Sequence, residues 1–197
     1  ARLIANPGCY PTATLLALLP FIDYIDTESP IFIDAKSGVS GAGKNPSDTT
    51  HYCQINDNVH AYNPFKHRHM PEIQEKIKIL KGKDLPINFV PHLLPLTRGM
   101  LVSVFATLKD DINVNQVLNN SYKNCEFIRL RDKPVDVKSV AGTNFCDLFV
   151  AKNGKALFVS SAIDNLLRGA SSQAVVNANI ICGYEENEGI PKIAYVP

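Results

Sequence analysis

The sequence lacks an excess of charge of either sign, and it lacks a long apolar run. Its 20 Lys and Arg residues nearly balance its 19 Asp and Glu residues, which leaves a net charge of +1. That balance excludes the strong positive field on which binding to nucleic acid or to an anionic membrane surface depends. The longest apolar stretches, such as 15–22 with its Pro20, are shorter than the ~20 residues of a membrane-spanning helix. We therefore expect neither a membrane protein nor a nucleic-acid-binding protein.

Several cofactor and metal motifs are also absent. No Gly-x-Gly-x-x-Gly fingerprint occurs, so the chain carries no dinucleotide-binding half of its own. The glycine-rich segment 37–44 is followed by Asn45 where a Walker A loop has Ser or Thr. No Cys-x-x-Cys pair and no His-Glu-x-x-His pattern is present. We therefore predict no metal site.

The five cysteines are odd in number and irregularly spaced, and no signal peptide precedes them. This usage argues against a disulfide framework and indicates a reducing compartment, which we take to be the cytoplasm. The chain begins at Ala1-Arg2, in a segment that has the pattern of the end of a buried strand. We therefore expect a preceding segment to be missing.

The order of predicted elements indicates an α+β fold with a mixed, largely antiparallel sheet and helices on one face. A length of 197 residues with 45% hydrophobic and 20% charged residues is ordinary for one good core or two small ones. The other face of such a sheet commonly binds a partner, so self-association is a reasonable hypothesis. Strands are predicted at 2–5, 31–35, 101–109, 126–130, 144–150 and 155–163, and helices from Cys9, over 71–81, from Asn113 and over 165–181.

One cysteine stands at the start of a predicted helix. Cys9 follows the Pro7-Gly8 bend and precedes the apolar run 13–20. The unpaired N–H groups and the positive end of the helix dipole at such a position favour a thiolate, so we expect a lowered pKa and a nucleophilic sulfur. Free cysteines are usually buried as small hydrophobes. We apply that interpretation to the other four: Cys53, Cys125, Cys146 and Cys182.

A pair of histidines opens the helix predicted after Pro71. His67 and His69 are imidazole bases of the kind that an activated cysteine needs as a proton-transfer partner. Each could equally cap the helix or bind solvent, and together with a cysteine they could supply three zinc ligands. We discount zinc because no spacing in the sequence would hold the metal rigidly.

The segment Ser37 to Lys44 is a second candidate for chemistry. Its three glycines and two serines could surround an anion with backbone N–H groups, and the Lys44 ammonium would neutralise charge. A flexible connection is the more frequent role of such a loop.

Five segments in the same order closely resemble the N-acetyl-gamma-glutamyl-phosphate reductase family of arginine biosynthesis. The resemblance covers nearly the whole chain, and its segments are 6–12, 37–44, 67–73, 91–99 and 164–170. It implies NADPH-dependent reduction of an acyl phosphate to a semialdehyde. It also implies a fold similar to the C-terminal domain of glyceraldehyde-3-phosphate and aspartate-semialdehyde dehydrogenases. The family's N-terminal nucleotide-binding domain has no counterpart here.

The resemblance also implies roles for individual residues. Cys9 would attack the acyl phosphate to form a thioester, and His67 would be the general acid/base. Backbone N–H groups at the start of the Cys9 helix would stabilise the oxyanion. The expected substrate-binding residues are Ser37, Arg68, His69 and Arg98, and the expected NADP(H)-binding residues are Gly38, Ser40, Gly41 and Asn165. Asn165 is also predicted to cap the last helix.

We predict that residues 1–163 form a catalytic and dimerisation domain. Residues 164–197, a helix and tail, would pack on the missing nucleotide-binding domain. That helix carries Ala170, Ala174, Val175, Ala178 and Ile181 on one side, which we expect to be partly exposed or packed on a neighbouring copy. The expected partners are a small acyl phosphate and a second copy of the chain. Without the nucleotide domain we expect no turnover, and a Cys-His hydrolase or acyltransferase and a non-catalytic dimerisation fragment remain as alternatives.

Overall fold

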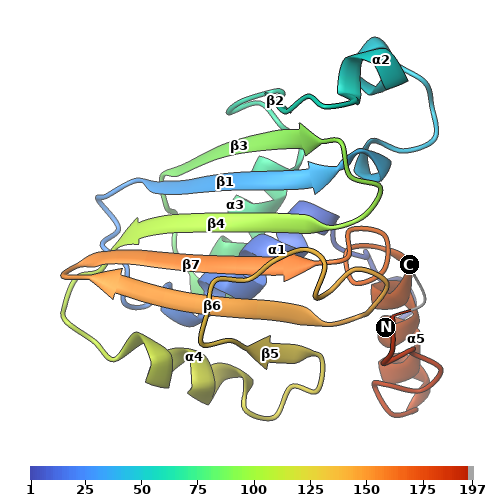
Figure 1. Ribbon diagram of the computed structural model, residues 1–197. Helices are drawn as coiled ribbons and strands as arrows, with labels where there is room; N and C mark the ends of the chain where they lie inside the picture. The colour runs from blue at the N-terminus through green and yellow to red at the C-terminus, as the bar shows by residue number, and fades with distance from the viewer. Residues whose placement is uncertain (195–197) are drawn as a thin grey trace.

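Alternating burial along the strands builds one mixed sheet. In strands β3 (Ile87–Leu94) and β4 (Met100–Thr107) every second residue is buried, as period-2 side-chain alternation requires of a half-covered sheet. The computed structural model describes residues 1–194 and places seven strands in the order β2-β3-β1-β4-β7-β6-β5 (Figure 1). The remaining strands are β1 (Ile31–Gly38), β2 (His60–Ala61), β5 (Ile128–Leu130), β6 (Cys146–Asn153) and β7 (Ala156–Ile163).

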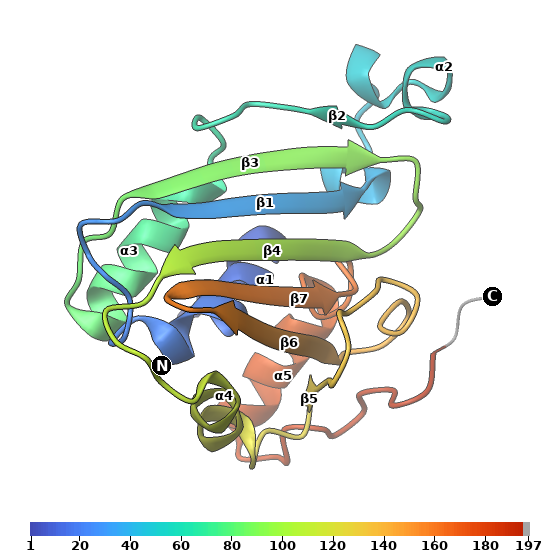
Figure 2. The same ribbon diagram turned by 60° about the vertical axis from the view of Figure 1, so that its left-hand side comes forward.

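Most neighbouring strands are antiparallel, and two pairs are parallel. Strands β1 and β3 run parallel, as do β5 and β6, and the other neighbours pair in the antiparallel sense. The helices α1 (Cys9–Leu18), α3 (His69–Lys81) and α5 (Ser171–Cys182) lie on one side of the sheet (Figure 2). The predicted α+β class, with a mixed, largely antiparallel sheet and helices on one face, is therefore confirmed.

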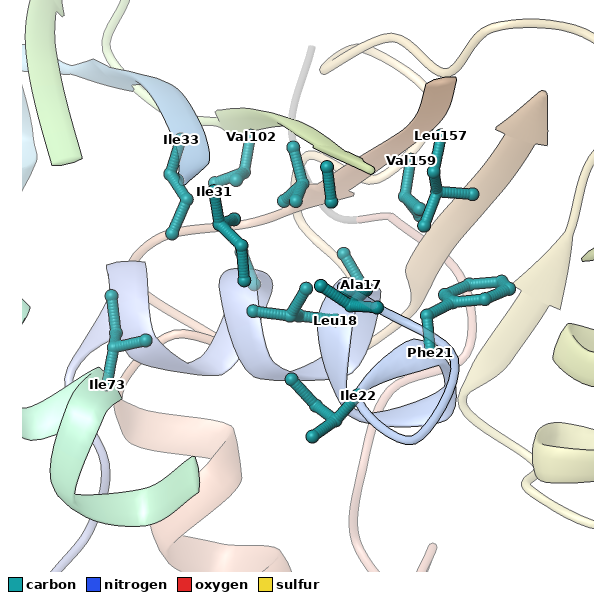
Figure 3. Packing of buried hydrophobic residues seen from close by; sticks show 14 of the residues in the cluster. Ala17, Leu18, Phe21, Ile22, Ile31, Ile33, Ile73, Val102, Leu157 and Val159 are labelled. Carbon is teal, nitrogen blue, oxygen red and sulfur yellow. The ribbon is translucent and has the colours of Figure 1, made fainter. Parts of the chain in front are cut away.

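Most residues of helix α1 are buried because the helix lies in the centre of the core. Ala13, Ala17 and Leu18 are fully buried, as expected of a helix surrounded by other elements. Figure 3 shows Leu18 beneath Ile31 and Val102 of the sheet, with Ile73 of α3 beside α1. The helix continues into a 3-10 turn at Leu19–Phe21. This packing fixes the direction in which the N-terminus of α1 points.

The predicted boundaries of two further helices are confirmed. Helix α3 carries Pro71 in its first turn and ends at Gly82, which has a left-handed backbone with a φ of 66°. Helix α4 (Val114–Tyr122) begins after Asn113, whose side chain accepts a hydrogen bond from the Gln116 N–H. The shorter helical segments are Val39–Ala42, Asp48–Thr50 and α2 (Tyr52–Ile55).

Strand β3 was not predicted, and it lies between β1 and the short β2. Pro91 stands in its middle and has no N–H to donate. A strand residue directs its N and its carbonyl to the same neighbour, and the Pro91 carbonyl accepts from Tyr62 N–H at 3.0 Å. The nitrogen of Pro91 therefore faces the β2 edge, where a proline is tolerated.

Three other predictions need correction. Ser37 and Gly38 belong to β1 and not to a loop, because their backbones pair with β3. No strand forms over 2–5. The last helix begins at Ser171 rather than at Asn165, since residues 165–170 form turns. Asn165 is therefore not the cap of that helix. The final residues of the predicted tail, 195–197, lie outside the described residues.

Helix α5 exposes apolar side chains, as expected. Val175 and Ile181 are nearly half exposed, and Ile180 and Tyr184 more so. Only Ser172, Val176 and Asn179 of this helix are buried. Within residues 1–194, no helix is both long enough and apolar enough to cross a lipid bilayer.

Candidate active site

A small cavity of about 30 Å³ lies at the N-terminus of α1. A cavity of this volume accommodates about one or two water molecules. The cavity brings together most of the residues predicted from sequence. Its lining residues are Cys9, Tyr10, Ser37, Gly38, Gly41, Ala42, Tyr62, His67, Arg68, His69 and Leu93.

The predicted helix start places Cys9 in this cavity. Gly8 is the N-cap residue with an extended backbone, and Cys9 is the first helical residue. Pro11 lies in the first turn, where its missing N–H would have no partner in the helix. The Thr12 hydroxyl donates to the Gly8 carbonyl at 2.9 Å, which closes the turn. The local sequence therefore determines that the sulfur is carried by a rigid helix end.

The direction of the Cys9 pKa shift is opposite to the prediction. Burial raises the pKa of the Cys9 thiol, and the Glu72 carboxylate adds to that effect. Backbone N–H groups of Tyr10 and Cys9 and the Arg68 guanidinium act to lower it, but they do not offset burial. The sequence shows the helix end but does not show how completely the surrounding elements exclude water from the sulfur.

His67 is held in one tautomer by its neighbour. The backbone N–H of His69 donates to His67 Nδ1 at 3.2 Å. Because an N–H can only donate, Nδ1 is the acceptor and the neutral ring carries its proton on Nε2. His67 therefore offers a hydrogen-bond donor at Nε2.

Both histidines are neutral at physiological pH. Burial, together with His69 and Arg68, lowers the pKa of His67 to about 4. Burial and Arg68 likewise lower the pKa of His69 to about 4. Since the Cys9 pKa is raised, the proton belongs to sulfur and not to imidazole. The resting pair is a neutral thiol and a neutral imidazole.

Arg68 is the cation at this cavity. The residue is exposed and lines the cavity beside Cys9, and it makes no ion pair with another described residue. A guanidinium that is free in this way suits a carboxylate or phosphate oxygen. His69, in contrast, is buried, and its Nδ1 has no hydrogen-bond partner among the residues that the structure describes.

The predicted cofactor-binding residues lie at and behind one wall of the cavity. Gly38 and Gly41 line it directly. The Asn165 side chain donates to Ser40 Oγ at 3.0 Å and accepts from Gly99 N–H at 2.8 Å. Asn165 therefore joins the 39–42 turn to the β3–β4 connection, which is a supporting role that the sequence did not indicate.

Arg98 lies outside the cavity. Its Nη1 atom is 3.3 Å from the carboxylate of Asp164, which is fully buried. Asp164 also accepts from the N–H groups of Gly142, Leu166 and Leu167. The structure therefore does not bring Arg98 together with the other predicted substrate-binding residues.

Four further residues of this region were not expected from the sequence. The Tyr62 hydroxyl donates to the Tyr10 hydroxyl at 3.0 Å, and burial raises the pKa of both phenols, which remain neutral donors. Glu72 accepts from Gly8 N–H at 3.0 Å. A Cβ on Gly169 would come within 2.7 Å of Cys9 Cβ. Tyr10, Glu72 and Gly169 lie in the segments 6–12, 67–73 and 164–170, whereas nothing in the sequence marked Tyr62.

Within the described range, no three His, Cys, Asp or Glu side chains are placed to hold a metal ion. The five cysteines are free thiols, with Cys146 buried and Cys53, Cys125 and Cys182 exposed. The interpretation of those last three as buried hydrophobes is therefore wrong.

Comparison with known proteins identifies relatives over the whole chain. Residues 9–165 match the family described as "Semialdehyde dehydrogenase, dimerisation domain". The chain is 66% identical to an N-acetyl-gamma-glutamyl-phosphate reductase of Sulfurovum sp. and 59% identical to one of Wolinella succinogenes. Both alignments cover 100% of this chain, but only 59% and 58% of those relatives. The chain thus spans about three fifths of the length of these curated relatives.

Solved structures share the fold at low sequence identity. An aspartate semialdehyde dehydrogenase II from Vibrio cholerae superposes with a TM-score of 0.73 at 22% identity, over 91% of this chain and 62% of its own. An aspartate semialdehyde dehydrogenase from Francisella tularensis gives 0.68 at 11% identity, over 89% of this chain and 64% of its own.

Proposed function

Because this chain belongs to the semialdehyde dehydrogenase family by its dimerisation domain, we propose that it is the catalytic part of an N-acetyl-gamma-glutamyl-phosphate reductase. The proposed reaction is the NADPH-dependent reduction of N-acetyl-gamma-glutamyl phosphate to N-acetylglutamate 5-semialdehyde, a cytoplasmic step of arginine biosynthesis. One observation supports this proposal most strongly. The thiol at the helix start and the imidazole of His67 line the same small cavity.

In the proposed mechanism the Cys9 sulfur attacks the gamma-carbonyl carbon, and phosphate leaves to give a thioester on Cys9. The thiol loses its proton during the attack, because the resting pair is neutral, and the departing phosphate takes up that proton and leaves as hydrogen phosphate. Backbone N–H groups of Cys9 and Tyr10, together with Arg68, stabilise the negative charge on sulfur. Arg68 also holds an anionic group of the substrate.

His67 acts as a donor in this mechanism. Reduction of the thioester carbon produces a thiohemiacetal oxyanion, and Nε2–H of His67 is the group that can donate to that oxygen. Collapse of the thiohemiacetal returns the electron pair to sulfur and releases the aldehyde. His67 in this neutral tautomer cannot form a resting ion pair of imidazolium and thiolate with Cys9.

The walls of the cavity are suited to a nicotinamide ring. Gly38, Gly41 and Ala42 present little side chain beside Cys9. A Cβ on Gly41 would lie 2.7 Å from Ser37 Oγ, so a larger residue here would displace the Ser37 hydroxyl. NADPH, when bound, supplies the hydride. Its nucleotide part must be bound by residues outside this chain, which has no Gly-x-Gly-x-x-Gly fingerprint.

A second copy of the chain is the proposed protein partner. The sheet face that carries no helix presents a row of phenylalanines across β1, β4, β7 and β6. Phe32 pairs with Phe105 and Phe105 pairs with Phe158 in register, and Phe32 and Phe105 are about half exposed. Phe149 continues the row next to Phe158. Residues 1–163 would then be the catalytic and dimerisation domain, and residues 164–197 would contact the nucleotide-binding part.

The hydrolase alternative is less favoured by the site. A Cys-His hydrolase needs an Asn or Asp that accepts a hydrogen bond from the imidazole and orients it. In this chain Nδ1 of His67 is an acceptor that is occupied by the His69 N–H.

The test uses a fusion of residues 1–197 to the portion of the Sulfurovum relative that this chain does not cover. Acyl-phosphate-dependent oxidation of NADPH is expected, and Cys9→Ser should slow it by about a thousandfold or more. Residues 1–197 alone should give no turnover. Turnover that survives Cys9→Ser would contradict the proposal, and acyl transfer without NADPH would favour the hydrolase.

A further inference from the structure

Glu72 makes a contact that the proposed mechanism does not use. This carboxylate lies in the first turn of α3, and its Oε1 atom accepts the backbone N–H of Gly8 at 3.0 Å. Gly8 directly precedes Cys9 and is the N-cap of α1, and no side chain caps that helix from within its own segment. The N–H of an N-cap residue has no partner inside its helix. Glu72, which lies on another helix, therefore supplies the hydrogen-bond acceptor for the Gly8 N–H that the local sequence does not supply.

The first turn of α3 holds the same peptide from a second side. A Cβ on Gly8 would lie 2.5 Å from His69 Nε2, so the His69 ring packs directly over the Gly8 Cα. On the other side of the turn, the missing side chain of Gly169 leaves room for Cys9 Cβ. The turn that carries the thiol is thus enclosed by two elements, and Glu72 provides its one hydrogen bond to a side chain of α3.

We propose that Glu72 is a positioning residue, whose carboxylate holds the Gly8–Cys9 turn against the first turn of α3 and so fixes the thiol relative to His67. This inference rests on the proposed function of Cys9. Displacement of a reacting group by about 1 Å can reduce a rate by about a hundredfold, so a residue that fixes the turn contributes to catalysis without contacting the substrate.

The hydrogen bond of Glu72 positions the thiol, but the negative charge of Glu72 disfavours ionisation of that thiol. A carboxylate beside a thiol disfavours the thiolate, and Glu72 raises the pKa of Cys9. Arg68 opposes that effect, and the other titratable groups around the thiol, Tyr10, Tyr62, His67 and His69, are neutral at physiological pH. The electrostatic and geometric roles of Glu72 can therefore be separated by experiment.

Two substitutions separate them. Glu72→Gln keeps a carbonyl oxygen at the same reach and removes the charge. Glu72→Asp keeps the charge and withdraws the acceptor by one methylene. Glu75→Ala is the matched control, because Glu75 lies on the same helix, is exposed and, among residues 1–194, forms an ion pair only with Lys76. The measurements are the amide-exchange rate of Gly8 by NMR and the pH profile of Cys9 alkylation, with the Cys9 peptide quantified by mass spectrometry.

We expect Glu72→Asp to accelerate exchange of the Gly8 amide by about tenfold, since a hydrogen bond to a charged group is lost, and to leave the alkylation profile near that of the wild type. Glu72→Gln should keep Gly8 protected within about threefold and raise the alkylation rate near neutral pH by about threefold, because the pKa of Cys9 falls. Glu75→Ala should change neither.

Wild-type protection of Gly8 in Glu72→Asp would overturn the inference, and so would equal loss of protection in Glu72→Gln and Glu72→Asp. These readouts need neither NADPH nor turnover, so they decide the role of Glu72 even if the proposed reaction is absent. In the active fusion, Glu72→Asp should lower kcat by about tenfold with KM nearly unchanged, and Glu72→Gln should restore most of it.

Discussion

Cys9 and His67 line the same cavity, and both side chains are neutral near physiological pH. Burial raises the pKa of the thiol and lowers the pKa of the imidazole to about 4. Both shifts have the same main cause, which is the burial of each side chain away from water. Neither the thiol nor the imidazole is therefore charged near neutral pH, and Arg68 is the cationic side chain that lines the cavity.

The first prediction concerns the reactivity of Cys9 itself. Iodoacetamide should label Cys9 more slowly than it labels glutathione at pH 7, and the rate should rise through a pKa above the ordinary thiol value of about 8.5. Arg68→Ala should reduce the rate near neutral pH by about two- to threefold, because a cation that lowers the pKa is lost. Labelling of the Cys9 peptide is measured against pH, with Cys9→Ser as control. Faster labelling than glutathione at mild acidity would show a resting thiolate instead.

The second prediction concerns stability at low pH. Both histidines have folded-state pKa values of about 4, below the 6.5 of an ordinary histidine. The unfolded state therefore binds more protons between pH 6.5 and 4, and stability is full above pH 6.5 and falls as the pH is lowered through this range. We expect the pair to account for a loss of about 2 kcal/mol, after allowance for solvent screening. Urea unfolding of the wild type and of His67→Gln/His69→Gln at several pH values measures it. An equal acid loss in both proteins would contradict the assignment.

At the scale of elements, the site is built where three segments meet. The N-terminus of α1 carries the thiol, the first turn of α3 carries His69 and Glu72, and the turns at 165–170 pack behind Cys9. Asp164 and Asn165 tie these last turns to the 98–99 and 142 connections through buried hydrogen bonds. Because Gly169 has no side chain, the start of α1 and the turns at 165–170 can pack closely against each other.

The third prediction tests that close approach. In Gly169→Ala the new Cβ would lie 2.6 Å from the Asn165 carbonyl and 2.7 Å from Cys9 Cβ, so the backbone must shift. We expect a loss of about 2–3 kcal/mol in the free energy of unfolding, together with altered labelling of Cys9. Gly82→Ala is the comparison, because its Cβ meets nothing within 4 Å and only the left-handed backbone is strained, at about 1 kcal/mol. Denaturant unfolding measures both, and equal losses would contradict the steric argument.

At the scale of the whole molecule, two apolar surfaces are left open. One is the phenylalanine row on the sheet face without helices, and the other is the exposed side of α5 with Ile180, next to the exposed Tyr184 just beyond the helix. Exposed apolar patches of this kind mark interaction surfaces. The chain spans about three fifths of its curated relatives. We therefore propose that the sheet face binds a second copy and that α5 contacts the portion that the relatives have in addition.

The fourth prediction separates these surfaces. Phe105→Glu places a charge in the centre of the phenylalanine row at a half-exposed position, so the fold should persist while the self-association constant falls by about a hundredfold or more. Ile180→Lys on α5 should leave self-association of residues 1–197 unchanged. Sedimentation equilibrium measures both variants. Dimers that survive Phe105→Glu and dissociate in Ile180→Lys would reverse the assignment.

Sequence reasoning was most successful where the information was local. The helix start at Cys9, the end of α3 at Gly82 and the cap of α4 at Asn113 each depend on a few neighbouring residues, and all are confirmed. Strand β3 was missed because the role of Pro91 depends on which neighbour its nitrogen faces. The start of α5 was placed too early, because Asp164 holds the preceding turns by contacts with distant segments.

By itself, the sequence determined that a thiol stands at the end of an apolar helix, that two histidines open another, and that the sheet is covered on one side. These features follow from capping geometry and from the periodicity of apolar residues, which act over a few positions. Only the tertiary structure decided the state of the site. Burial and contacts between remote segments determine the tautomer of His67 and the neutral state of Cys9. They also determine that Glu72 accepts the Gly8 N–H and that Arg98 pairs with Asp164. Desolvation and hydrogen bonding are set by everything that surrounds a group, and a linear sequence does not show those surroundings.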